Sequence, residues 1–158
     1  MQSGFTTVKI FCDGACSGNP GIGGWGAVIV CDDLEQTLSG SVEYTTNNRM
    51  ELVAAIRSLE QVKEQNGAGV GIEVHTDSKY VKDGITSWIH NWHKNNWMTS
   101  SKKPVKNAEL WRALHDYDQI MNITWYWVKG HSGHHYNDKA DYLAREAINK
   151  FKNNQRGA

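Results

Sequence analysis

The chain is poor in cysteine, has no excess of either charge and contains no long apolar run. Its three cysteines, Cys12, Cys16 and Cys31, lack the paired spacing of a metal site, and their odd number predicts reduced thiols in a cytoplasmic protein. No stretch approaches the roughly 20 apolar residues that span a bilayer, so we predict no membrane association. The 17 basic and 17 acidic residues cancel, which removes whole-chain basicity as an argument for a nucleic-acid partner.

Internal repeats and low-complexity tracts are also absent from the sequence. A chain of 158 residues can bury one core, so we predict a single domain over 1–158 in which 151–158 forms a flexible tail. Seven tryptophans is a high number for this length, and their rings must be either packed or used in binding.

Hydrophobic patterning predicts an α/β fold. The predicted strands are 6–15, 25–30, 36–44, 70–76 and 123–128. The predicted helices run from the capping cluster 45–48 to 65–67, from 78 to 85, over 107–121 and over 138–150. Short turns join the first three strands, and helices alternate with strands afterwards. We therefore expect a mixed five-stranded sheet, an antiparallel meander plus parallel strands, flanked by helices on both faces.

Four acidic residues occupy positions where a carboxylate needs a partner. They are Asp13 near the end of an apolar strand, Glu51 and Asp141 in the first turns of two helices, and Asp77 directly after the fourth strand. Sites of α/β folds gather at such strand ends, and clustered carboxylates repel one another without a cation. Because only oxygen ligands are offered, the pattern favours Mg²⁺ or Mn²⁺ over Zn²⁺ and indicates phosphoryl chemistry.

Each of these acids also has an ordinary structural interpretation. Asp13 can form a turn, and Glu51 can close a capping box with Asn48. Asp77 can cap a helix, and Asp141 can be stabilised by the partial positive charge at the N-terminus of its helix. Taken singly these roles are the more common ones, but four such acids together call for a shared cause.

Four segments carry a resemblance to a known family. They are 11–21 (FCDGACSGNPG), 45–52 (TTNNRMEL), 76–81 (TDSKYV) and 127–134 (WVKGHSGH). In these four segments, and in their order along the chain, the sequence resembles bacterial type 1 ribonuclease H. The resemblance implies a ribonuclease H-like fold and a metal-dependent endonuclease that hydrolyses the RNA strand of RNA–DNA hybrids. It also implies cleavage that is largely independent of sequence and leaves 5′-phosphate and 3′-hydroxyl ends.

The same resemblance assigns roles to the acids and to one histidine. Asp13, Glu51, Asp77 and Asp141 would coordinate two Mg²⁺ ions when substrate is bound, and Mn²⁺ would be able to substitute. In this two-metal mechanism one ion activates the attacking water and the other stabilises the departing oxygen. His131 resembles the family's loop histidine, which shuttles a proton or helps product leave. The expected partner is an RNA–DNA hybrid duplex, bound by a monomer.

Substrate contacts are implied on both strands of the hybrid. Gly14, Cys16, Asn19, Asn47 and Asn48 are expected to meet the minor groove, where 2′-hydroxyl groups distinguish RNA from DNA. Turn formation by Asn19 and helix capping by Asn47 and Asn48 are the alternative roles, and both are compatible with binding.

One segment is locally basic although the whole chain is neutral. Residues 84–108 contain no Asp or Glu. The segment matches the family's basic handle, which contacts DNA phosphates, through Trp88, Trp92, Lys94, Lys102 and Lys103. Trp88 and Trp92 are four residues apart and can equally pack on each other. This segment is less basic than is usual in the family. Lys79, a further expected substrate contact, stands where the family commonly has Gln. Both differences concern affinity and salt dependence rather than chemistry.

Two other function classes compete with an active ribonuclease. A hybrid-binding module without catalysis would be expected to lack one of the four acids, and none is missing. An integrase or resolvase core shares the acidic fold but cuts DNA, and it would not need segments that read 2′-hydroxyl groups.

Overall fold

Three β-rich segments joined by short turns form the antiparallel part of the sheet, as predicted. They are β1 (Thr7–Ser17), β2 (Gly21–Cys31) and β3 (Leu34–Thr45), and each is longer than expected. The computed structural model describes residues 7–129 and 134–157. Residues 21–24, expected as a turn, already belong to β2, and the turn before them is 18–20.

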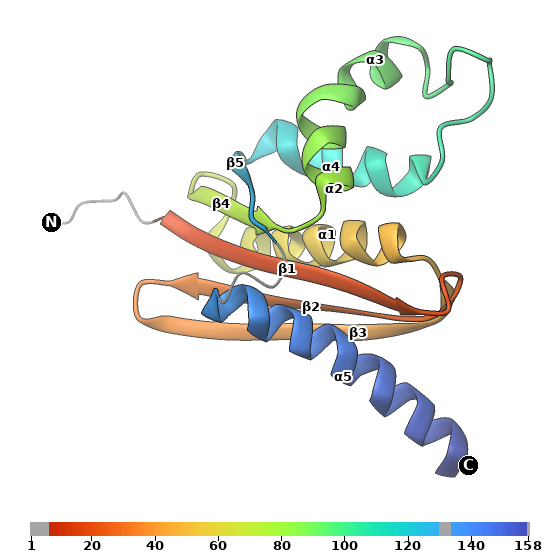
Figure 1. Ribbon diagram of the computed structural model, residues 1–158. Helices are drawn as coiled ribbons and strands as arrows, with labels where there is room; N and C mark the ends of the chain where they lie inside the picture. The colour runs from red at the N-terminus through yellow and green to blue at the C-terminus, as the bar shows by residue number, and fades with distance from the viewer. Residues whose placement is uncertain (1–6, 130–133, 158) are drawn as a thin grey trace, which may run out of the picture.

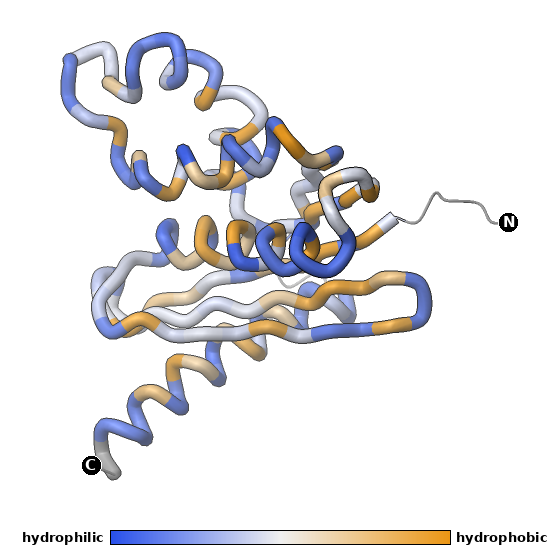
Figure 2. Tube along the Cα trace, turned by 180° about the vertical axis from the view of Figure 1, so that it is seen from behind, coloured by the Kyte–Doolittle hydropathy of each residue, from blue (hydrophilic) through white to orange (hydrophobic). Residues whose placement is uncertain are grey.

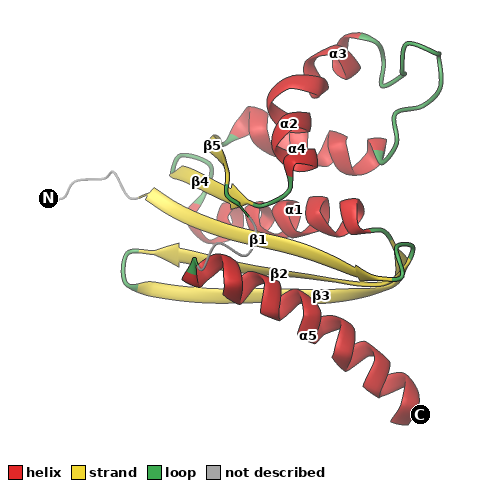
Figure 3. Ribbon diagram, in the orientation of Figure 1, coloured by secondary structure: helices red, strands yellow, loops and turns green. Residues whose placement is uncertain are grey.

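Two parallel strands complete the sheet on the other side of β1. β4 (Gly71–Thr76) pairs with β1, and β5 (Asn122–Trp127) pairs with β4, which gives the strand order β3-β2-β1-β4-β5. The predicted mixed five-stranded sheet with helices on both faces is confirmed (Figure 3). β1 pairs with β4 only as far as Cys12 and Thr76. At this point β4 ends, while β1 continues to pair with β2, and the carboxyl ends of such parallel strands are where α/β sheets form their sites.

Helices cover the sheet on opposite faces (Figure 1). α1 (Asn47–Asn66) and α4 (Ala108–Ile120) lie on one side, and α5 (His135–Gly157) lies across β1, β2 and β3 on the other. Hydrophobic and hydrophilic residues alternate along α1 and α5 (Figure 2), as expected of helices with one face on a core. The larger core lies between the sheet and α1, and a smaller one lies under α5.

α5 sits directly on the sheet because β2 offers glycine beneath it. A Cβ atom on Gly26 would come within 2.5 Å of the carbonyl oxygen of Ala140 in α5. The helix begins at His135 and runs to Gly157, so its predicted bounds of 138 and 150 are wrong at both ends. Lys152 Nζ donates a hydrogen bond of 2.9 Å to Ser17 Oγ, which anchors the segment expected to be a tail.

The segment after β4 is a longer helical run than predicted. α2 (Lys79–Asp83) continues through a π-helical turn, η1 (Gly84–Trp88), into α3 (Ile89–Lys94), whereas the sequence predicted an end at Ile85. A Cβ on Gly84 would overlap the Trp111 indole ring from α4. α3 and the chain after it project from the sheet (Figure 1), and residues 84–107 are called the protrusion. Among the described helices, none has the length and apolar character needed to cross a membrane.

Candidate active site

Two acids lie side by side where the pairing of β1 with β4 ends. Asp13 follows Cys12, the last β1 residue paired with β4, and Asp77 follows Thr76, the last residue of β4. The cap of α2 is Ser78, whose Oγ accepts a hydrogen bond of 3.2 Å from Val81 N. The capping interpretation of Asp77 is therefore wrong.

The two helical acids also lie outside the capping positions. The N-cap of α1 is Thr46, whose Oγ1 accepts a hydrogen bond of 3.3 Å from Arg49 N. Glu51 is beyond the first turn, so it does not close a capping box. Asp141 likewise lies beyond the first turn of α5, where the acid is Asp138. Attraction to the helix dipole, which is confined to the first turn, does not explain the position of Asp141.

Three carboxylates converge at this point of the sheet. Asp13, Glu51 and Asp77 each offer an oxygen, and these three atoms lie within 4.8 Å of one another. Asp13 and Glu51 are 7% and 6% exposed. Gly14 N donates a hydrogen bond of 2.9 Å to Asp13 Oδ1, whereas Glu51 Oε1 is buried with no hydrogen-bond partner among the described residues. Leaving such an oxygen unsatisfied costs free energy, so the cluster is built for something that binds carboxylates.

Electrostatics lead to the same conclusion. Burial, together with the charges of Asp77 and Asp141, raises the pKa of Asp13 from 3.8 to about 8. Burial and the neighbouring Asp13 also raise the pKa of Glu51 well above its ordinary value. Within the described residues, no lysine or arginine forms an ion pair with Asp13, Glu51 or Asp77. An all-oxygen donor set of this charge fits a hard divalent cation.

The fourth predicted ligand lies beside this cluster rather than in it. Asp141 is close enough to raise the pKa of Asp13. Its Oδ2 accepts a hydrogen bond of 3.1 Å from Nε of Arg145, one turn further along α5, and forms an ion pair with Nη2 of the same residue at 3.0 Å. His131, the predicted proton shuttle, lies outside the described residues. The structure thus brings three of the predicted acids together and places the fourth next to them.

An aromatic stack, which sequence reasoning missed, supports the strand ends. Phe11, His75 and Tyr126 are paired across β1, β4 and β5, with ring centroids 4.7 and 4.9 Å apart and nearly parallel planes. Phe11 also contacts Tyr136 at the start of α5, with centroids 5.0 Å apart. Because Asp13 and Asp77 lie two residues beyond this row, the stack fixes the strands that carry them. The alternation of apolar and polar residues along each strand could not reveal this stack, because stacking depends on the register in which the three strands pair.

A tryptophan and a lysine flank Asp77. Trp127 Nε1 donates a hydrogen bond of 3.0 Å to the carbonyl oxygen of Asp77. Lys79 Nζ lies 4.7 Å from the centroid of the Trp127 ring, which is within range for a cation–π contact. The unusual lysine is therefore held close to the acidic cluster, where the sequence predicted a substrate contact.

A polar cavity of about 390 Å³ lies at the start of α1. Three of the predicted substrate contacts line it, Asn19, Asn47 and Asn48, together with Pro20, Thr46, Lys106 and Asn107. Asn19 Oδ1 accepts a hydrogen bond of 2.8 Å from Asn47 N, so the predicted turn residue also caps the helix. We call this cavity the asparagine groove. The role of Asn107 was not predicted, and the only signal for Lys106 was the basic segment.

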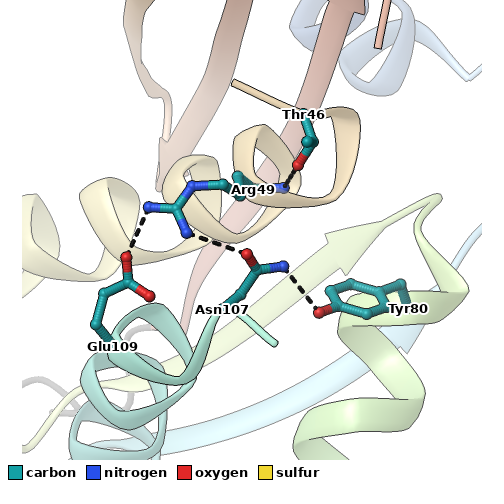
Figure 4. A network of polar contacts seen from close by, with 5 residues as sticks. All are labelled: Thr46, Arg49, Tyr80, Asn107 and Glu109. Carbon is teal, nitrogen blue, oxygen red and sulfur yellow. Dashed lines mark hydrogen bonds and ion pairs between the residues drawn. The ribbon is translucent and has the colours of Figure 1, made fainter. Parts of the chain in front are cut away.

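Polar contacts join the walls of the asparagine groove (Figure 4). Arg49 Nη1 in α1 donates a hydrogen bond of 3.0 Å to Asn107 Oδ1, and Asn107 Nδ2 donates one of 3.1 Å to Tyr80 Oη in α2. Arg49 also forms an ion pair with Glu109 at 2.7 Å. This network fixes the starts of α1 and α4 relative to each other.

The remaining predicted contacts lie near the groove or on the protrusion. Gly14 packs against the backbone of Glu51, and Cys16 Sγ donates a hydrogen bond of 3.3 Å to the Thr45 carbonyl; neither lines the groove. The rings of Trp88 and Trp92 are 5.9 Å apart, and Trp92 packs on Trp111, so the packing alternative is confirmed. Trp88 nevertheless remains 40% exposed. The three predicted lysines of the protrusion are exposed: Lys94, Lys102 and Lys103.

Comparison with known proteins agrees with this architecture. The family model described as RNase H matches residues 6–149. The chain is 57% identical over 145 residues to Ribonuclease H of Mesorhizobium japonicum, covering 92% of this chain and 80% of that protein. It is 54% identical over 149 residues to Ribonuclease H of Rhizobium meliloti, covering 94% of this chain and 95% of that protein.

Solved structures show the same fold. LC9-RNase H1, a type 1 RNase H with the type 2 active-site motif, superposes with a TM-score of 0.82 at 28% identity, covering 95% of this chain and 75% of that one. LC11-RNase H1, solved in complex with RNA/DNA hybrid, gives a TM-score of 0.72 at 24% identity, covering 90% of this chain and 97% of that one. The chain therefore belongs to the RNase H family and is an enzyme of that family.

Proposed function

We propose that the enzyme hydrolyses the RNA strand of RNA–DNA hybrids endonucleolytically, using Mg²⁺ held by Asp13, Glu51 and Asp77. The observation that carries this proposal is the convergence of three carboxylate oxygens within 4.8 Å, two of the side chains being buried. When bound, divalent cations would supply water activation and charge neutralisation for phosphodiester hydrolysis, in a two-metal arrangement that leaves 5′-phosphate and 3′-hydroxyl ends.

The protein's own part in this chemistry is to hold the acids in place. Asp13 is oriented by the Gly14 N–H, and Glu51 is fixed by its burial in α1. Asp77 is held through its backbone by Trp127. We propose that Asp141 completes the cluster once its bond to Arg145 is exchanged, and that His131 moves a proton during turnover.

The asparagine groove supports recognition of a nucleic-acid strand. It combines amide side chains and the Lys106 ammonium, a set that suits a phosphate or a 2′-hydroxyl group. We propose that one strand of the hybrid lies across this groove while the protrusion contacts the other strand. LC11-RNase H1, which shares the fold, was solved with RNA/DNA hybrid.

Incubation with end-labelled substrates tests the proposal. An RNA–DNA hybrid should be cut in its RNA strand with Mg²⁺ and left intact with EDTA, while duplex DNA and duplex RNA of the same sequence should survive. Products should be extendable by a polymerase at their 3′ ends, which requires a free hydroxyl. Equal cutting of all three duplexes, or cutting that persists in EDTA, would contradict the proposal.

A further inference from the structure

A second set of metal-ligating side chains lies outside the acidic cluster. His93 in α3 and His115 in α4 line a cavity of about 310 Å³ together with Asn96, Trp97, Arg112 and Asp116. Neither histidine contributes to the asparagine groove or to the carboxylates described above. The cavity lies between the protrusion and α4, so a ligand bound there would contact both.

The spacing of the two imidazole rings is compatible with their binding one metal ion together. Their centroids are 5.1 Å apart and their planes are inclined by 46°. With a Zn–N distance of about 2.0–2.1 Å and tetrahedral geometry, the centroids of two histidine ligands lie about 5.2 Å apart. Ordinary packing of aromatic rings allows a much wider range, roughly 4.5–7 Å.

One of the rings also has an unsatisfied nitrogen. Nδ1 of His115 is buried and has no hydrogen-bond partner among the described residues. A buried polar atom without a partner costs free energy, and coordination through Nδ1 would remove that cost. Of the residues that line the cavity, Arg112 lies over the Trp97 ring at 5.3 Å, and Asp116 supplies a negative charge.

We propose that His93 and His115 form a binding site for a transition-metal ion such as Zn²⁺, with water completing the coordination. Imidazole nitrogen suits Zn²⁺, Ni²⁺ and Cu²⁺, whereas Mg²⁺ prefers the oxygen ligands of the carboxylate cluster. A bound ion would tie α3 to α4 and stabilise the protrusion. The site would therefore be chemically distinct from the one that serves hydrolysis.

Metal titration of the full chain tests this site without reference to cleavage. Zn²⁺ is titrated calorimetrically at pH 7.5 in excess Mg²⁺, which saturates the carboxylates, and Co²⁺ absorption reports tetrahedral coordination. We expect one tight site, weakened at least tenfold in His93→Ala and in His115→Ala. His90→Ala is the matched control, because His90 is exposed on the same helix and does not line the cavity.

Thermal unfolding provides the second readout. Zn²⁺ should raise the Tm of the wild type and of His90→Ala but not that of His115→Ala, because only an ion bound to the folded state stabilises it. Zn²⁺ binding that is as strong in His93→Ala and His115→Ala as in the wild type would overturn the proposal. Failure of the wild type to bind Zn²⁺ in excess Mg²⁺ would overturn it as well, and would leave the two rings as a packing contact.

Discussion

Asp13 shows what a single side chain contributes to the site. Its neighbours on the strand predicted a buried position, and burial of a carboxylate predicted a partner. The structure confirms the burial and identifies the partners as two further acids. The bond between Asp141 and Arg145 could not be predicted in the same way, because a surface pair one turn apart on a helix is compatible with many side-chain arrangements.

The raised pKa of Asp13 makes the stability of the metal-free protein depend on pH. The unfolded chain releases this proton near pH 3.8, whereas the folded chain retains it to about pH 8. The unfolded state therefore binds fewer protons in this window, and stability falls as pH rises through it. At pH 8 without metal, Asp13→Asn should be more stable than the wild type by on the order of 5 kcal/mol in urea unfolding.

The control for this measurement is Asp33→Asn, an exposed turn residue. It should follow the wild type at every pH. Saturating Mg²⁺ should stabilise the wild type more than Asp13→Asn, and Asp13→Asn should not cleave hybrid. A wild-type protein whose metal-free stability stays constant between pH 4 and pH 8 would show that Asp13 is not held as described.

The sequence predicted the type and order of the helices and strands better than the residues at which they begin and end. The capping cluster 45–48 and the alternation of β1 and β4 indicated the right elements because their signals are local. The π-helical turn at Gly84 had no local signal, and the Trp111 ring that packs against Gly84 comes from a helix far along the chain. Past Lys150, α5 likewise makes a distant contact that the sequence does not reveal, between Lys152 and Ser17.

The π-helical turn predicts a strong effect of adding one methyl group. Gly84→Ala would place its Cβ inside the Trp111 ring and should destabilise the fold by about 1–3 kcal/mol, as overpacking does. Gly69→Ala, where a Cβ meets nothing within 4 Å, is the matched control and should be nearly neutral. Urea unfolding measures both. Equal stability of the two variants would mean that Trp111 does not close on the turn.

The junction between α1 and α4 predicts a binding defect rather than a chemical one. Asn107→Ala removes the bonds to Arg49 and Tyr80 and one wall of the asparagine groove. We expect KM for hybrid to rise about tenfold, the effect of losing roughly 1.4 kcal/mol, with kcat changed less than about twofold. A fall in kcat at unchanged KM would instead place Asn107 with the carboxylates.

For the whole molecule, a net charge of zero conceals an uneven distribution of charge. The basic residues that face the proposed substrate lie on the protrusion and at the asparagine groove, while three acids are gathered in the cluster formed by β1, α1 and the residue after β4. Composition alone gave no argument for a nucleic-acid partner, because it sums charges that the fold separates. Hydrophobic patterning and the order of the motifs along the chain both predicted the correct fold.

Local basicity predicts a measurable dependence of binding on salt. Removal of one lysine that neutralises a phosphate should reduce the slope of log Kd against log salt concentration by about 0.9. Lys106→Ala, which changes the groove, should reduce it by this amount, whereas Lys63→Ala, exposed near the end of α1, should not. Fluorescence anisotropy with a labelled hybrid in Ca²⁺ measures the slopes. Identical slopes would remove Lys106 from the interface.

The most direct test of the central claim is calorimetric titration of Mg²⁺ into the wild type and into Glu51→Gln at pH 7.5. Glutamine keeps the shape of the buried side chain but removes its charge, so a shared cation site should weaken at least tenfold while the fold persists by circular dichroism. We predict that loss of affinity together with loss of hybrid cleavage. Unchanged Mg²⁺ affinity in Glu51→Gln would contradict the claim that these carboxylates share a cation.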